Sequence, residues 1–157
     1  MVRSSRVRIR LAHPTDAPVL ARLRYEFRHE YRPAAEPRAR FLARCTPWMR
    51  KHLRDPHWRC WVATIDDAIV GHAWLGLFDK IPNPSAGEAE RHGYLTNCYV
   101  RPAYRNRGIG GRLVKVLLAW TRRAKVDAVI LWPSRTSRSL YERHGARAAD
   151  DILEIRR

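Results

Sequence analysis

The sequence predicts a mixed α/β (α+β) fold, in which a mostly antiparallel central sheet carries helices on both faces. Three observations lead to this prediction. An alternating apolar run near the N-terminus is followed by apolar residues at helical spacing. Two strand-like runs separated by Asp66-Asp67 indicate a hairpin, which pairs antiparallel strands. A strand, a helix and a second strand then follow from Tyr94 to Trp132, and such a unit requires a parallel crossover, right-handed by rule.

The first strand and the first helix follow from the spacing of apolar residues. Arg6–Leu11 alternates arginines with apolar residues, as a half-buried strand does. The next apolar residues recur at helical spacing and predict a helix that ends near Tyr31. Thr15 or Asp16 precedes this helix as its N-cap, and two prolines beyond it form a linker.

A second helix and the hairpin are expected next. Apolar side chains at helical spacing predict a helix over Phe41–Leu53, interrupted or kinked near Pro47, because proline lacks the N–H that a helix interior needs. The apolar pattern then changes to that of strands. Trp58–Ile65 and Ile69–Phe78 form the two arms of the hairpin around a tight turn.

The last third of the chain contains the parallel crossover. Tyr94–Val100 is strand-like, and apolar spacing predicts a helix over Leu113–Lys125. Ala128–Trp132 is a continuous apolar run, which is typical of a strand buried on both faces. Ser137–His144 is expected to form a short helix, and Ile152–Ile155 offers a last short strand.

Length and cysteine content restrict the class of protein. With 157 residues the chain is expected to form a single domain over residues 1–157. No stretch approaches the ~20 apolar residues of a membrane span, and no apolar region follows the basic N-terminal residues, so neither a membrane partner nor a secretory signal is predicted. Three widely spaced cysteines exclude a disulfide framework and favour a cytoplasmic location. No metal is predicted, because the Cys and His spacings fit no standard zinc pattern.

The net charge is unusually high. The chain has 31 Lys and Arg against 15 Asp and Glu, which gives a formal net charge of +16. A field of this strength attracts polyanions such as nucleic acid or a phosphorylated cofactor. The arginines are spread along the whole chain, so a solvated basic surface also accounts for the charge. Nucleic acid is therefore an alternative partner and not the favoured one.

The most informative segment is Arg105–Gly111, which lies between the end of a strand and the start of a helix. Backbone N–H groups in the first turn of a helix have no partner within it, and they bind phosphate. Gly108 and Gly110 let the backbone approach a ligand closely. The string G-x-x-x-x-G-K-[ST] of a Walker loop is absent, and Leu113 replaces the third glycine of a Rossmann fingerprint, so both of these phosphate sites are disfavoured.

At this point the sequence resembles the GCN5-related N-acetyltransferase (GNAT) family. The acetyl-CoA loop of that family reads [RQ]-x-x-G-x-[GA], and Arg105–Gly110 matches it. A second signature of the family, L-Y-x-x-x-G-[FA], is matched by Leu140–Ala146 on the next short helix. The element order of roughly residues 6–157 also resembles the family's fold, which places the parallel crossover at the cofactor site.

The resemblance implies acetyl-CoA as the acetyl donor and direct attack of a primary amine on its thioester. Tyr141 matches the family's tyrosine acid, which protonates the departing thiolate. The pyrophosphate would lie on the glycine-rich turn and the pantetheine along the strand before it. Ser134 stands where many members carry Asn, and Ser137 lies on the same face. The residues implied to bind the cofactor are Cys98, Tyr99, Val100, Arg105, Asn106, Arg107, Gly108, Ile109, Gly110, Gly111, Ser134 and Ser137.

The acceptor is implied to be an amine-bearing small molecule or protein. The strand before the loop has no carboxylate, although some relatives carry a glutamate base there. Glu26 and Glu30 lie four residues apart on one helix face, and Glu88 and Glu90 precede the strand. We assign Glu26, Glu30 and Glu90 to substrate binding. The general base stays open among Glu26, Glu30, Glu88, Glu90 and a water chain.

Two other classes of function stay open at this stage. One is a basic nucleic-acid or ribosome-associated binding module on the same fold. The other is a nonenzymatic CoA-binding sensor, which the unassigned base suggests. A homodimer is expected only by analogy with relatives.

Overall fold

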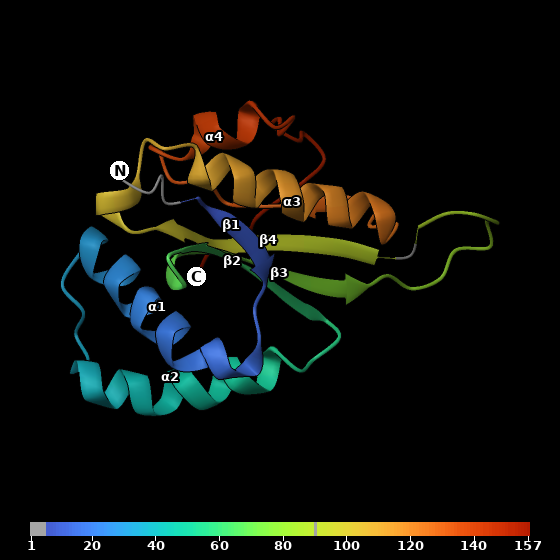
Figure 1. Ribbon diagram of the computed structural model, residues 1–157. Helices are drawn as coiled ribbons and strands as arrows, with labels where there is room; N and C mark the ends of the chain where they lie inside the picture. The colour runs from blue at the N-terminus through green and yellow to red at the C-terminus, as the bar shows by residue number, and fades with distance from the viewer. Residues whose placement is uncertain (1–5, 90) are drawn as a thin grey trace.

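Five strands form one sheet at the centre of the computed structural model, which describes residues 6–89 and 91–157 (Figure 1). They lie in the order β1-β2-β3-β4-β5. The three pairs among β1 to β4 are antiparallel, and β4 and β5 pair in parallel. This arrangement confirms the predicted fold class. The bounds of the strands are Arg8–Leu11 (β1), Trp58–Ile65 (β2), Ala68–Asp79 (β3), Arg91–Val100 (β4) and Ala128–Ile130 (β5).

Helices cover both faces of this sheet. Figure 1 shows α1 and α2 on one face and α3 with α4 on the other. Short 3-10 turns at Pro14–Asp16 and Pro102–Tyr104 precede α1 and the loop before α3. The helix bounds are Ala17–Tyr31 (α1), Arg38–His52 (α2), Ile109–Arg123 (α3) and Arg138–Glu142 (α4).

The predicted hairpin is present and its turn has a simple cause. β2 and β3 close with Ile65 opposite Ala68, so Asp66 and Asp67 alone connect them. Both aspartates have positive φ, 46° and 64°. A two-residue turn of this kind matches the right-handed twist of the flanking strands, and aspartate tolerates the left-handed conformation.

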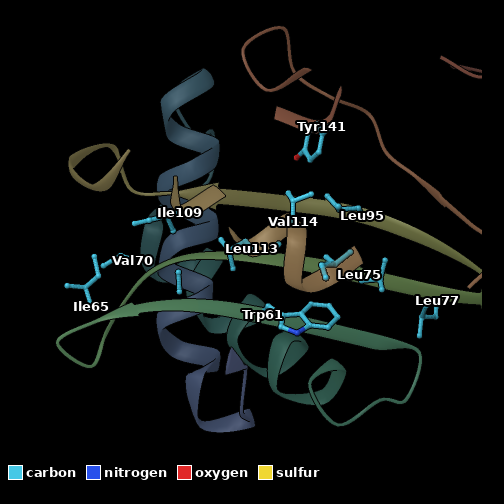
Figure 2. Packing of buried hydrophobic residues seen from close by; sticks show 13 residues of the cluster. Trp61, Ile65, Val70, Leu75, Leu77, Leu95, Ile109, Leu113, Val114 and Tyr141 are labelled. Carbon is cyan, nitrogen blue, oxygen red and sulfur yellow. The ribbon is translucent and has the colours of Figure 1, made fainter. Parts of the chain in front are cut away.

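Each face of the sheet buries its own apolar cluster. On the α3 face, Leu75 and Leu113 are fully buried within the cluster shown in Figure 2. On the other face, Leu20, Leu23 and Trp74 are buried beneath α1 and α2. Fully burying a leucine contributes about 1.5–3 kcal/mol, so these clusters fix α1 and α3 against opposite sides of β3 and β4.

Two predictions about the C-terminal third are wrong. Ile152–Ile155 forms no strand, and Leu153 is 93% exposed. Alternating apolar residues become a strand only where a sheet edge offers hydrogen bonds, and β5 offers three residues. The run Ala128–Trp132 is not buried on both faces, because β5 ends at Ile130 as the edge strand of the described sheet and Trp132 is 54% exposed.

Of the two possibilities predicted near Pro47, an interruption or a kink, the interruption is wrong. α2 runs without a break through this proline. The missing proline N–H leaves the carbonyl of Ala43 without its helical partner. Both residues lie on the exposed side of the helix, where water satisfies a carbonyl at little cost.

Candidate functional site

The site begins where two parallel strands separate. β5 pairs with β4 only at His92, Gly93 and Tyr94. β4 continues to Val100, and over its last residues it has β3 on one side only. Backbone N–H and C=O groups on the other side are therefore free to bind a ligand that lies along the strand.

A β-bulge in the part of β4 beyond β5 determines which face of the sheet each of its side chains points to. His72 pairs with Tyr99 and Trp74 with Thr96, so two residues of β4 stand opposite one residue of β3. One of the two is Asn97, whose φ of 53° is left-handed. The other is Cys98, which packs against the cluster on the α3 face, whereas the next residue, Tyr99, packs in the cluster under α1 and α2.

The start of α3 lies beside the end of β4 and is open. Its N-cap residue, Gly108, has a φ of 71° and no side chain that could cap the helix. The first N–H groups of α3 therefore have no partner within the helix, and the helix dipole adds positive potential there. A Cβ on Gly108 would point into open space, whereas one on Gly110 would meet Leu140 of α4 at 3.4 Å. Gly108 thus provides the backbone turn and Gly110 the close approach of the two helices.

These elements enclose a cavity of about 500 Å³. Its walls come from the end of α1, the end of β4, the loop before α3, the start of α3, and the turn and helix around α4. It brings together every residue predicted to bind the cofactor except Arg107, whose guanidinium lies 5.6 Å from the ring centre of Tyr104 and not in the wall.

Tyr141, the predicted acid, lies in the wall of this cavity and is 8% exposed. Its hydroxyl lies beside the Cys98 thiol, close enough for each group to affect the pKa of the other. Burial and the neighbouring Cys98 raise the pKa of Tyr141 above its usual value, and burial raises the pKa of Cys98 to about 11. Both groups are therefore protonated at neutral pH, and Tyr141 can act as a proton donor.

Three hydroxyl side chains form the turn before α4. The Ser137 hydroxyl accepts a hydrogen bond from the Ser134 N–H at 2.9 Å and lies 2.8 Å from the Ser134 hydroxyl. Thr136 adds a third hydroxyl 3.2 Å from that of Ser134. The serines thus shape the turn and also face the cavity.

Glu30 is placed in the cavity, but it is already paired. Its carboxylate accepts hydrogen bonds from Arg105 at 2.7 and 2.9 Å and from the Tyr99 hydroxyl at 3.1 Å. Arg105 also donates to the backbone carbonyl of Val100 at 2.8 Å. Burial, and secondarily the Glu30 charge, raise the pKa of Tyr99. The arginine of the loop motif is therefore held by α1 and the end of β4.

The other predicted carboxylates do not line the cavity. Glu26 accepts two hydrogen bonds from Arg101, both at 3.0 Å. Glu88 lies near Lys80 and accepts a hydrogen bond from Asn83 at 2.9 Å. Glu90 lies outside the described residues.

Several cavity residues were not predicted from the sequence. Phe27 and Tyr31 come from α1, where their spacing relative to Glu30 places all three near the same helix end. This spacing was the signal from which the sequence could have predicted Phe27 and Tyr31 as cavity residues. The full set that sequence reasoning missed is Phe27, Tyr31, Tyr104, Thr136, Leu140 and Arg143.

Two kinds of site are not found among the described residues. Nowhere in residues 6–89 and 91–157 do three His, Cys, Asp or Glu side chains gather in a way that could hold a metal ion. No helix in the same part of the chain is long and apolar enough to span a membrane.

Comparisons with known proteins identify a family. Residues 20–146 match the sequence model of the acetyltransferase (GNAT) family. A search of curated proteins finds no match.

Solved structures resemble the whole chain. A predicted acetyltransferase from Clostridium acetobutylicum, solved with acetyl-CoA, has a TM-score of 0.76 at 23% identity and covers 96% of both chains. A ribosomal-protein-alanine N-acetyltransferase from Brucella melitensis has a TM-score of 0.71 at 26% identity, covering 97% of this chain and 99% of its own. An aminoglycoside N-acetyltransferase in complex with CoA has a TM-score of 0.74 at 18% identity, covering 100% and 98%.

Proposed function

The chain belongs to the acetyltransferase (GNAT) family, and on this premise we propose that it transfers an acetyl group from acetyl-CoA to a primary amine. The similar proteins act on different acceptors, a ribosomal-protein alanine in one case and an aminoglycoside in another. Family membership therefore does not identify the acceptor, which must be inferred from the residues of this chain.

One observation carries the proposal. The wall of a single cavity contains the open start of α3, the end of β4 that β5 leaves uncovered, and the Tyr141 side chain. These groups fit acetyl-CoA part by part. N–H groups at Ile109, Gly110 and Gly111 suit the pyrophosphate, and free backbone groups of β4 suit the amides of pantetheine.

The residues around Cys98 suit the acetyl end. Acetyl-CoA supplies an activated thioester, whose carbonyl carbon a neutral amine can attack. A bulge leaves its extra residue unpaired in the ladder, so a backbone N–H at the bulge would stabilise the oxygen that gains negative charge. Tyr141, kept protonated by burial and by Cys98, would give its proton to the leaving sulfur.

The reaction also needs a general base that accepts the proton of the attacking amine. Glu30 alone, among the carboxylates that the structure describes, lines the cavity. Both of its oxygens already accept hydrogen bonds from Arg105, and one also accepts a hydrogen bond from the Tyr99 hydroxyl, so these contacts compete with an incoming amine. We therefore assign Glu30 to holding Arg105 and Tyr99 in place, and the amine proton to water.

Calorimetric titration with acetyl-CoA, followed by a thiol-release assay against a panel of amines, tests the proposal. We expect micromolar binding of acetyl-CoA and CoA and amine-dependent release of CoA. Binding without release for any amine would indicate a CoA-binding sensor. Absence of binding would contradict the proposal, and nucleic acid would become the ligand to test.

A further inference from the structure

Arg24 occupies a position on α1 where an apolar side chain would be expected. It follows Leu20 by four residues and precedes Phe27 by three, and both of these side chains pack in the cluster beneath α1. The Arg24 side chain is consequently part-buried, and burial lowers its pKa. Burying a charge is costly unless it is paired, so such a residue marks a candidate binding site.

Neighbouring arginines at the same end of β4 have carboxylate partners and Arg24 has none in the described part of the chain. Arg101 pairs with Glu26 at 3.0 Å and Arg105 pairs with Glu30 at 2.7 Å. Residues 6–89 and 91–157 place no Asp or Glu within 4.0 Å of Arg24. The carboxylates of α1 are therefore used by other arginines, and the Arg24 charge is left uncompensated.

The surroundings of Arg24 are polar but not acidic. Its Nη1 donates to the side-chain oxygen of Asn97 at 3.3 Å, which uses one of the five N–H donors of a guanidinium. Its guanidinium carbon lies 5.5 Å from the ring centre of Phe27. His72, fully buried nearby, is neutral because burial, and secondarily Arg24, lower its pKa to about 3. Arg28 adds a second positive charge.

This guanidinium lies across β4 from the acetyl end of the cavity. Asn97 immediately precedes Cys98 in the bulge, and Cys98 faces Tyr141 on the α3 side. Asn97 instead reaches Arg24 on the α1 side. An amine that approaches the thioester from the α1 side would therefore bring the rest of its molecule beside Arg24.

We propose that the acceptor is an amine that also carries a carboxylate or phosphate group, and that Arg24 binds this anionic group. The inference rests on the proposed function and names the substrate class of the same site. A planar guanidinium offers paired N–H donors that match carboxylate and phosphate oxygens. A polycationic acceptor such as an aminoglycoside is disfavoured, because Arg24 and Arg28 would repel it and Glu26 and Glu30 are already paired.

The test measures kcat/KM for matched pairs of amines in the wild type and two variants. The pairs are amino acids with their amides, and aminoalkyl phosphates with the corresponding amino alcohols; an aminoglycoside is added as the polycationic acceptor. Arg24→Gln removes the proposed anchor. Arg22→Gln is the matched control, because Arg22 lies on the same helix two residues before Arg24, and side chains two positions apart on a helix do not face the same side.

We expect the wild type to prefer the anionic member of at least one pair, and the better anion identifies carboxylate or phosphate as the group. Arg24→Gln should lower kcat/KM for that amine by roughly 10- to 100-fold, the loss of a hydrogen-bonded charged partner, with little change for its uncharged counterpart. Arg22→Gln should leave both unchanged. A wild type that prefers uncharged or polycationic amines, or an Arg24→Gln loss that is equal for every amine, would overturn the inference.

Titration with acetyl-CoA separates this inference from the proposed function. If acetyl-CoA binds and only uncharged or cationic amines are acetylated, the inference fails and the function stands. If acetyl-CoA binds and no amine is acetylated, anionic amines are titrated into the complex with CoA, and binding that Arg24→Gln does not weaken overturns the inference. If acetyl-CoA does not bind, both proposals fail.

Discussion

The two sides of β4 differ in the groups that they offer to a ligand. On the α3 side, the groups proposed to hold acetyl-CoA are mostly backbone: the open turn at Gly108, the N–H groups that follow it and the unpaired end of the strand. On the α1 side, the groups are side chains that meet across long stretches of sequence. Arg101 and Glu26 are separated by 75 positions, and Arg24 and Asn97 by 73.

The difference explains which side suits a shared ligand. A backbone site binds the same phosphate and amide groups whatever side chains surround it, which suits a donor used throughout a family. A side-chain site changes with single substitutions, which suits an acceptor that differs between relatives. The comparison therefore assigns donor binding to the α3 side and acceptor choice to the α1 side.

Gly108→Val should weaken acetyl-CoA binding on the α3 side, and this is the largest effect that we expect. A β-branched residue cannot easily hold a φ of 71°, so the first turn of α3 would reorient its N–H groups. We expect acetyl-CoA affinity to fall on the order of 100-fold in calorimetry, which corresponds to about 2.7 kcal/mol.

Gly87→Val is the matched control, since Gly87 has a φ of 84°, open space around an added Cβ and no place in the cavity wall. Its backbone strain should be similar, and its acetyl-CoA affinity unchanged. Equal affinities for the two variants would contradict the assignment of the turn to the donor.

Tyr141→Phe tests the chemistry at the end of the same side. Loss of a general acid lowers kcat by roughly 100-fold, while acetyl-CoA affinity should change little because the backbone contacts stay. Thiol-release kinetics and calorimetry measure the two quantities separately. Tyr25→Phe, on a side chain that stacks on His29 outside the cavity wall, is the control. An unchanged kcat would mean that Tyr141 only packs.

The protonation of His72 tests the account of charge on the α1 side. Its pKa is lowered from 6.5 to about 3 in the folded state, so between these values the unfolded chain binds more protons. This contribution to stability is therefore complete above pH 6.5 and is lost as the pH falls toward 3. His72→Leu should reduce the slope of unfolding free energy against pH in urea titrations, by at most about 1.4 kcal/mol per pH unit for one proton. Identical slopes would contradict a neutral His72.

Glu30→Gln should have the smallest effect and separates its two candidate roles. Freeing Arg105 and removing a negative charge from the cavity should tighten acetyl-CoA binding up to about fivefold, the scale of a partly exposed ion pair. The kcat should stay the same if Glu30 is a positioning residue. A large loss of kcat would make Glu30 the base. Glu36→Gln, which breaks a similar pair with Arg44 away from the cavity, is the control.

Most of the fold could be predicted because its signals are local. The hairpin around Asp66-Asp67 and the parallel crossover follow from periodicity and turn residues. The failures concern the surroundings of a segment. Ile152–Ile155 has a strand pattern but no edge to pair with, and Pro47 is tolerated because it lies on the exposed side of α2.

The candidate site divides in the same way. Gly108 and Tyr141 could be found because each lies in a short motif of fixed spacing. The pairing of Glu30 with Arg105 could not, because it depends on how α1 packs against the end of β4. Arg24 left one signal, a charged residue at an apolar helix position, but its unpaired state required the tertiary structure. The single domain, the cytoplasmic location and a homodimer stay predictions.

Initial rates over a matrix of acetyl-CoA and amine concentrations test the central claim most directly. If the donor occupies the α3 side of β4 while the acceptor occupies the α1 side, both must be bound before transfer. Double-reciprocal plots should then intersect. Parallel lines would show that an acetylated enzyme forms before the acceptor binds, with Cys98 as the nucleophile in the cavity wall, and would contradict the two-sided account.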